Sequence, residues 1–111
     1  MVFVWENKTW EEAMEHCHHM QKELVSLPSE SALKEVLKVS RSAQTDRVWT
    51  GLRYLADTWL WVKGEEVEYK AWGQGETTNC PAPSRRCGAL SLKDEHWESW
   101  DCADKLYFVC Q

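Results

Sequence analysis

The stretch TWEEAMEHC, at residues 9–17, decides how the first part of this chain folds. Thr9 and Glu12 have the spacing of a capping box, in which a hydroxyl and a carboxylate satisfy the first free amides of a helix. The apolar residues that follow recur at helical spacing, and they are Trp10, Ala13, Met14, Cys17 and Met20. The sequence therefore predicts an amphipathic helix that begins after Thr9 and buries Cys17.

A second helix is predicted further along the chain. A short extended segment, ELVSL at residues 23–27, and Pro28 separate it from the first helix. Ser29 or Ser31 is expected to cap it, because serine hydroxyls accept hydrogen bonds from the first free amides. Its apolar residues are three or four positions apart and predict a buried face, and they are Leu33, Val36 and Leu37.

From Val48 onward the pattern becomes that of strands, with runs rich in β-branched and aromatic residues. The predicted strands are VWTGL (48–52), TWLWV (58–62), VEYKAW (67–72), CGALSL (87–92) and KLYFVC (105–110). Residues 73–86 carry hardly an apolar side chain, and a loop this long in a small domain is usually functional or disordered. Two helices followed by short strands predict an α+β fold, and the length fits a single domain over residues 1–111.

The composition excludes several classes of partner. The formal net charge is -5, which argues against nucleic acid because nucleic-acid binding needs a basic surface. The longest apolar runs are far shorter than a membrane span, so we expect no membrane insertion of this segment. Eight tryptophans in 111 residues exceed what one core needs, which leaves some rings for a ligand or partner.

Five cysteines in so short a chain favour disulfides and an extracellular location, either secreted or in the ectodomain of a membrane protein. They are Cys17, Cys80, Cys87, Cys102 and Cys110. The odd number leaves one thiol over, and the lack of a Cys-x-x-Cys pair disfavours a structural zinc site. Asn7 begins the sequon Asn-Lys-Thr, so it is the predicted glycosylation site.

Several spaced motifs, in order and over nearly the whole chain, resemble those of the C-type lectin-like domains. The matching stretches are TWEEAMEHC (9–17), VWTGL (48–52), Trp59 with Trp61 and Gly64, WGQGE (72–76), Trp97, Cys102 and FVC (108–110). The resemblance implies a C-type lectin-like fold with disulfides Cys17–Cys110 and Cys87–Cys102. Cys80 would then be unpaired or form an interchain disulfide, and a Cys80–Cys87 bridge is the alternative.

Sugar-binding members of this family hold a calcium ion in the long loop. They use Glu-Pro-Asn or Gln-Pro-Asp, then a glutamate before the cysteine, then Trp-Asn-Asp, because calcium requires several oxygen ligands. Here these positions become ETT (76–78), Arg86 and WES (97–99). A guanidinium in the site opposes a dication. The resemblance therefore implies calcium-independent binding, with no metal and no cofactor.

The predicted ligand-binding residues are Glu76, Thr77, Thr78, Asn79, Arg85, Arg86, Glu98, Ser99 and Trp100. Glu98 and Ser99 are expected to face the surface that binds sugar in the relatives, and Trp97 to lie in the core. Trp100 is expected to stack on a ligand beside Arg86, with a structural role as the alternative.

The chain is thus interpreted as an extracellular recognition domain for a glycan or protein ligand. The resemblance speaks against an enzyme, and no nucleophile motif supports one. Two other hypotheses stay open: a calcium-dependent carbohydrate-binding lectin with altered ligands, and a structural or assembly module of a larger membrane receptor or disulfide-linked oligomer.

Overall fold

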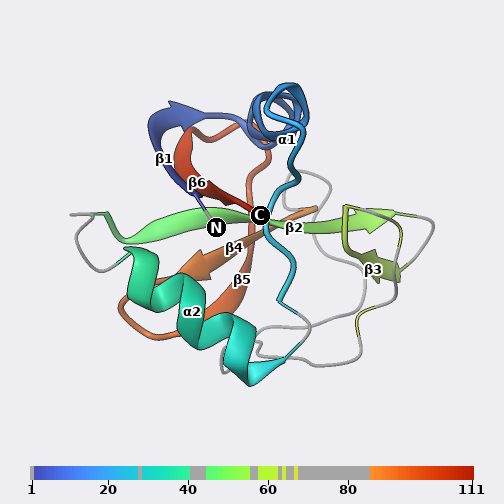
Figure 1. The fold of residues 1–111 in the computed structure, drawn as a ribbon. Coiled ribbons are helices and arrows are strands. Elements are labelled where there is room, and N and C mark those ends of the chain that lie inside the picture. The colour runs from blue at the N-terminus through green and yellow to red at the C-terminus, as the bar shows by residue number, and fades with distance from the viewer. Residues whose placement is uncertain are drawn as a thin grey trace.

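The computed structural model describes residues 2–27, 29–40, 45–55, 58–62, 64, 67 and 86–111. Within these residues the chain forms two helices and six strands (Figure 1). In chain order they are β1 (Val2–Lys8), α1 (Trp10–His19), α2 (Glu30–Ser40), β2 (Arg47–Leu55), β3 (Thr58–Leu60), β4 (Cys87–Ser91), β5 (His96–Trp100) and β6 (Leu106–Cys110). The expected strand at 67–72, apart from Val67, and the long loop, apart from Arg86, lie outside the described residues.

Both helices begin where their capping residues predict. The Thr9 hydroxyl accepts a hydrogen bond from the Glu12 amide at 3.3 Å, and the Glu12 carboxylate accepts one from the Thr9 amide at 3.0 Å. In α2 the Ser29 hydroxyl accepts from the Ala32 amide at 3.3 Å, so Ser29 is the capping residue and Ser31 lies inside the helix. Local sequence signals therefore fix both helix starts.

The strands form one sheet in the order β1-β6-β2-β4-β5, with β3 paired to β2. Neighbouring strands are antiparallel except β2 and β6, which are parallel. Figure 1 shows α1 above the sheet and α2 below it. The two edges of the five-strand order are β1 and β5.

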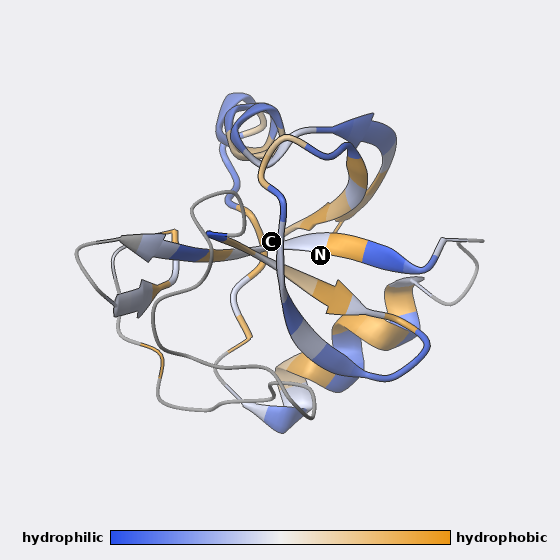
Figure 2. Cartoon of the chain, turned by 180° about the vertical axis from the view of Figure 1, so that it is seen from behind, coloured by the Kyte–Doolittle hydropathy of each residue, from blue (hydrophilic) through white to orange (hydrophobic). Residues whose placement is uncertain are grey.

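Each helix covers a separate part of the core. Trp10, Ala13 and Cys17 of α1 pack with buried residues that include Trp49 and Phe108. On the other side, the apolar face of α2 packs with a larger cluster, and the hydrophobic side of this helix faces the sheet in Figure 2. That cluster includes Leu33, Val36, Leu37, Val48, Leu90, Trp97 and Val109. The apolar spacing correctly predicts the burial of Trp10, Ala13 and Cys17 in α1 and of the α2 face, whereas Met14 is only partly buried and Met20, after the helix, is exposed.

Two disulfides join distant parts of the chain. Cys17 of α1 is bonded to Cys110 at the end of β6, and Cys87 of β4 is bonded to Cys102. They are the pairings that the resemblance implies. The first spans 93 residues, and in the chain-entropy model such a loop contributes roughly 4–5 kcal/mol by restricting the unfolded chain. Cys80 lies outside the described residues.

The order of elements differs from the expectation in one respect. The chain begins with a strand, β1, rather than with a helix. Val2, Phe3 and Val4 pair with Cys110, Val109 and Phe108 of β6, so the two ends of the chain lie side by side. This pairing joins segments about a hundred residues apart, which local patterns do not reveal. Neither described helix is long and apolar enough to cross a membrane.

Candidate functional site

The predicted ligand-binding residues fall into two groups. Glu76, Thr77, Thr78, Asn79 and Arg85 lie outside the described residues. The other four are Arg86, immediately before β4, and Glu98, Ser99 and Trp100 of β5. The geometry of the site can therefore be described along the β4–β5 pair.

The side chains of β5 alternate between the two faces of the sheet, as they do in any regular strand. Trp97 and Ser99 are buried, with 0% and 9% of their surface exposed, whereas Glu98 and Trp100 are partly exposed. The expectation that Glu98 and Ser99 face the same surface is therefore wrong, because adjacent strand residues point in opposite directions. Trp97 lies in the core as expected. Its ring packs edge-to-face against that of Trp61, with the two ring centroids 5.3 Å apart.

Arg47, at the start of β2, links Glu98 and Trp100. Its Nε donates a hydrogen bond to Oε1 of Glu98 at 2.9 Å, and its guanidinium carbon lies 4.1 Å from the centroid of the Trp100 ring. The side chains of Arg47 and Glu98 are 29% and 15% exposed, so the pair is shielded from bulk water more than a surface ion pair is. We call these three residues the Arg47 clamp.

Sequence reasoning missed Arg47 because it is 51 residues from Glu98. The sheet register brings them together: Arg47 pairs with Ser91 of β4, and β4 in turn pairs with β5, with Ala89 opposite Glu98. The expected strand, 48–52, begins one residue after Arg47, which the structure places at the start of β2, where it alternates with Val48 and faces the opposite side. Its distant partner could not be identified without the strand order.

Arg86 does not take the position predicted for it. It is exposed, and its guanidinium carbon lies 5.9 Å from the ring centroid of Tyr54. Tyr54 belongs to the core cluster that packs with α2, whereas Trp100 packs against the cluster on the α1 side. The cation beside Trp100 is therefore Arg47 and not Arg86.

The described part of this region does not fit a calcium ion. Calcium takes six to eight oxygen ligands, usually including several carboxylates. Glu98 is already bound by the guanidinium of Arg47, and the Ser99 side chain points to the opposite face. Among the residues that the structure describes, His, Cys, Asp and Glu side chains form no group of three or more that could hold a metal. The positive charge that pairs with the Glu98 carboxylate is therefore that of Arg47, a residue of the protein itself.

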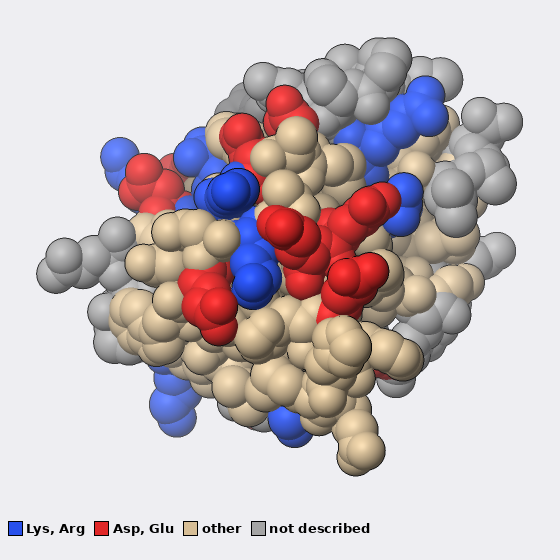
Figure 3. Space-filling model, turned by 90° about the horizontal axis from the view of Figure 1, so that it is seen from above, with Lys and Arg blue, Asp and Glu red and all other residues tan. Residues whose placement is uncertain are grey.

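Charge on the α1 side of the molecule is mixed. In the view from above, acidic and basic side chains lie next to one another over this face (Figure 3). The exposed carboxylate of Glu12 has a lowered pKa, because the Thr9 amide donates a hydrogen bond to it and the Thr9 hydroxyl adds a second. Among the residues that the structure describes, this face therefore carries no basic stripe of the kind that nucleic acid requires.

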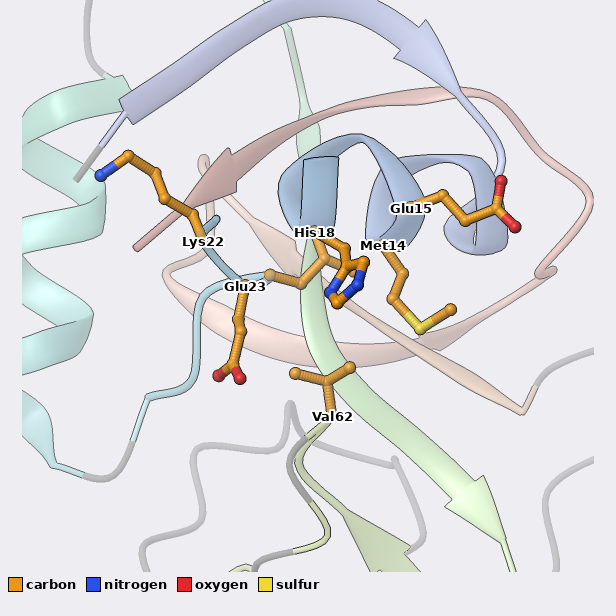
Figure 4. A pocket seen from close by; sticks show the side chains of 7 residues that line it. Met14, Glu15, His18, Lys22, Glu23 and Val62 are labelled. Atoms are coloured by element: carbon orange, nitrogen blue, oxygen red, sulfur yellow. The ribbon is translucent and has the colours of Figure 1, made fainter. Parts of the chain in front are cut away.

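A separate cavity of about 340 Å³ lies beside the end of α1. Met14, Leu24 and Val62 give it apolar walls, and Glu15, His18, Lys22 and Glu23 give it polar groups. In Figure 4 the side chains of Met14, His18 and Val62 come together, while Lys22 extends away from them. Its volume is at the lower end of the range for small-molecule sites. We call it the α1 groove, and none of its residues is in the predicted site.

Comparison with known proteins identifies the class. The chain belongs to the C-type lectin domain family, whose model, "Lectin C-type domain", matches residues 6–111. The described architecture is accordingly the α+β fold of C-type lectin-like domains.

Individual proteins resemble the chain closely in structure but have low sequence identity to it. Human lithostathine has a similar structure, with a TM-score of 0.82 at 29% identity, over 97% of this chain and 78% of that one. The mouse scavenger receptor C-type lectin carbohydrate-recognition domain has a TM-score of 0.84 at 25% identity, over 97% and 85%. The bovine secretory phospholipase A2 receptor is 23% identical over 108 residues, which are 96% of this chain and 7% of the receptor. The chain thus spans a small fraction of the receptors it resembles.

Proposed function

We propose that this domain recognises a glycan or protein ligand outside the cell, without calcium. The observation that carries the proposal is the 2.9 Å hydrogen bond from Arg47 to Glu98. In a calcium-dependent site, a carboxylate at this position would be free to bind the ion. Here its charge is neutralised by a residue of the same domain.

The clamp also supports a location for the ligand. The guanidinium of Arg47 has five N–H donors, and among the described residues Glu98 accepts from Nε, so the two terminal nitrogens are the donors proposed to meet a ligand acceptor. The ring of Trp100, fixed by the cation over it, adds a rigid apolar surface at low entropic cost. In the proposed site the loop residues Glu76, Thr77, Thr78, Asn79, Arg85 and Arg86 provide further polar contacts. Glu98 contributes by orienting Arg47.

The extracellular location is supported by the two disulfides, which persist in oxidising compartments. Relatives that include a secretory phospholipase A2 receptor agree with this location and with a role as one domain of a larger receptor. We further propose that the domain is not an enzyme and that Asn7 carries a glycan. Cys80 would stay unpaired or form an interchain disulfide.

A glycan array with and without chelator tests the proposal. Binding that is retained with chelator, and weakened in Arg47→Met, is the expected result. The matched control is His18→Ala in the α1 groove, which should bind like the wild type because that groove lies outside the proposed site. Binding abolished by chelator would instead identify a calcium-dependent lectin. Loss of binding in His18→Ala but not in Arg47→Met would move the ligand to the α1 groove.

A domain that binds no glycan is tested on protein ligands in the same way. Proteins captured from extracellular fluid are compared for wild type, Arg47→Met and His18→Ala. A ligand retained by His18→Ala and lost by Arg47→Met supports recognition through the clamp. A domain that captures nothing, yet forms dimers through Cys80, would be an assembly module.

A further inference from the structure

Trp5 in β1 is unusually exposed for so large an apolar side chain. With 57% of its surface accessible, it exceeds the other exposed large hydrophobic among the described residues, Met20, at 38%. The indole is nevertheless held in place, because its ring centroid lies 4.8 Å from that of Phe3 and 5.9 Å from that of Tyr107. Phe3 and Tyr107 in turn contact each other at 5.8 Å and pack against the core. The protein thus presents a fixed aromatic surface to the solvent.

Asn7, two residues along the same strand, begins the sequon Asn7-Lys8-Thr9 and is also exposed. The Cα atoms of residues two apart in an extended strand are roughly 7 Å apart. The pairing of β1 with β6 is irregular between Val4 and Lys8, where four residues of β1 span two of β6, so regular alternation does not hold in this segment. Trp5 and Asn7 are both exposed and are separated by one residue, so both side chains reach the solvent along the same short stretch of β1.

We propose that Asn7 carries an N-linked glycan whose first N-acetylglucosamine packs on the indole of Trp5. A pyranose ring has a face of C–H bonds that is apolar and slightly positive, which complements the negative face of an aromatic ring. A sugar attached to Asn7 begins one short side chain away from Trp5, so little chain entropy is lost when it folds back. The glycan would cover the exposed indole and stiffen the edge strand of the sheet.

This inference rests on the extracellular location in the proposed function, because the glycan is added in the secretory pathway. It also assigns a second role to Thr9, which completes the sequon and caps α1 through its hydroxyl. Thr9→Ala would therefore remove the glycan and the helix cap together. Asn7→Gln removes the sequon and leaves the cap intact, so it is the suitable variant.

The test uses the whole chain directed into the secretory pathway of mammalian cells. Mass spectrometry reports whether Asn7 is occupied, and an endoglycosidase then trims the glycan to one N-acetylglucosamine. Melting temperatures are compared for that form and for Asn7→Gln, each with Trp5 and with Trp5→Ala. We expect the single sugar to raise Tm by roughly 2–6 °C when Trp5 is present, and the rise to be lost in Trp5→Ala. Ring-current shifts of the sugar protons should likewise be present with Trp5 and absent in Trp5→Ala.

Two results would overturn the proposal. One is a secreted, disulfide-bonded protein in which Asn7 is unmodified. The other is an occupied Asn7 whose sugar changes Tm equally with Trp5 and with Trp5→Ala and shows no ring-current shift. Ligand binding without calcium is measured separately on Asn7→Gln, which should bind like the wild type. Failure of the glycan contact would thus leave the proposed recognition function unaffected, and loss of recognition would leave the glycan result unaffected.

Discussion

Arg47 and Glu98 are joined across the intervening strand β4 by an ion pair whose shortest N–O distance is 2.9 Å. Methionine at position 47 would keep an unbranched apolar stem near Trp100 but leave the partly buried carboxylate without its donor. We expect Arg47→Met to lower the free energy of unfolding by about 1–3 kcal/mol, as measured by urea denaturation.

The matched variants separate charge from shape. Arg47→Lys keeps the charge but loses the planar group over the indole. Its free energy of unfolding should therefore lie between those of the wild type and Arg47→Met. Arg47→Met combined with Glu98→Gln should recover part of the lost stability, because no unpaired charge then remains. Wild-type stability in Arg47→Met would show that the ion pair contributes nothing.

Calcium should leave the thermal stability of the domain nearly unchanged. A ligand stabilises a fold by binding it, so an ion with no suitable site produces no shift. The measurement is the melting temperature at zero and millimolar calcium, with magnesium as the control for ionic strength. A saturable rise that calcium alone produces and chelator reverses would contradict the proposed calcium independence.

Gln21 lies just after α1 with a φ of 58°, a left-handed conformation that L-residues adopt at a cost. The backbone there is fixed by hydrogen bonds from the Lys22 amide to the Cys17 carbonyl at 2.8 Å and from the Gln21 amide to the His18 carbonyl at 2.9 Å. Helix ends of this type usually have glycine at this position. We expect Gln21→Gly to raise the free energy of unfolding by about 0.5–1 kcal/mol. Gln21→Ala, which retains a Cβ, should give no such gain.

The capping box of α1 makes part of the stability depend on pH. The Thr9 hydrogen bonds lower the pKa of Glu12 below its ordinary value of 4.5, so the folded state favours the carboxylate. Its contribution is complete above the unfolded pKa and is lost as the pH falls through the folded pKa. Glu12→Gln can still form the capping box but does not titrate. The stability difference between wild type and Glu12→Gln should therefore shrink as the pH falls below 4.5 in urea denaturation, and a constant difference would contradict this account.

The helices and core could be predicted from sequence because their signals are local. Thr9, Glu12 and the spacing of Trp10, Ala13 and Cys17 all lie within one stretch, and the structure confirms the helix that they predict. Strand β1 was missed although VFVW is rich in β-branched and aromatic residues. Its identity as a strand depends on pairing with β6, at the far end of the chain.

The candidate site was predicted less well because it depends on strand order and alternation. Motif matching treated Glu98 and Ser99 as neighbours on one surface, whereas the pleat of β5 separates them. It also paired Trp100 with Arg86, which is nearer in sequence, and overlooked Arg47. The cation over Trp100 comes from β2, two strands away, and that relation follows from the register of three strands.

Trp97 and Trp100, three residues apart on β5, should differ in what they contribute. Trp97 is fully buried, so Trp97→Ala opens a core cavity and should cost roughly 3–5 kcal/mol of stability. Trp100 is partly exposed and carries Arg47 over its ring, so Trp100→Ala should cost less stability. Because it removes a ring proposed to contact the ligand, it should weaken binding by more than about 1 kcal/mol.

Arg86→Ala, at an exposed position, should weaken binding similarly and leave stability nearly unchanged. Urea denaturation and binding titrations on the three alanine variants, with the ligand found on the array or by capture, separate the two effects. Normal binding together with a loss of stability as large as that of Trp97→Ala would make Trp100 a core residue. The ligand would then have to contact another surface, because the Arg47 clamp would serve only to hold β2 and β5 together across β4.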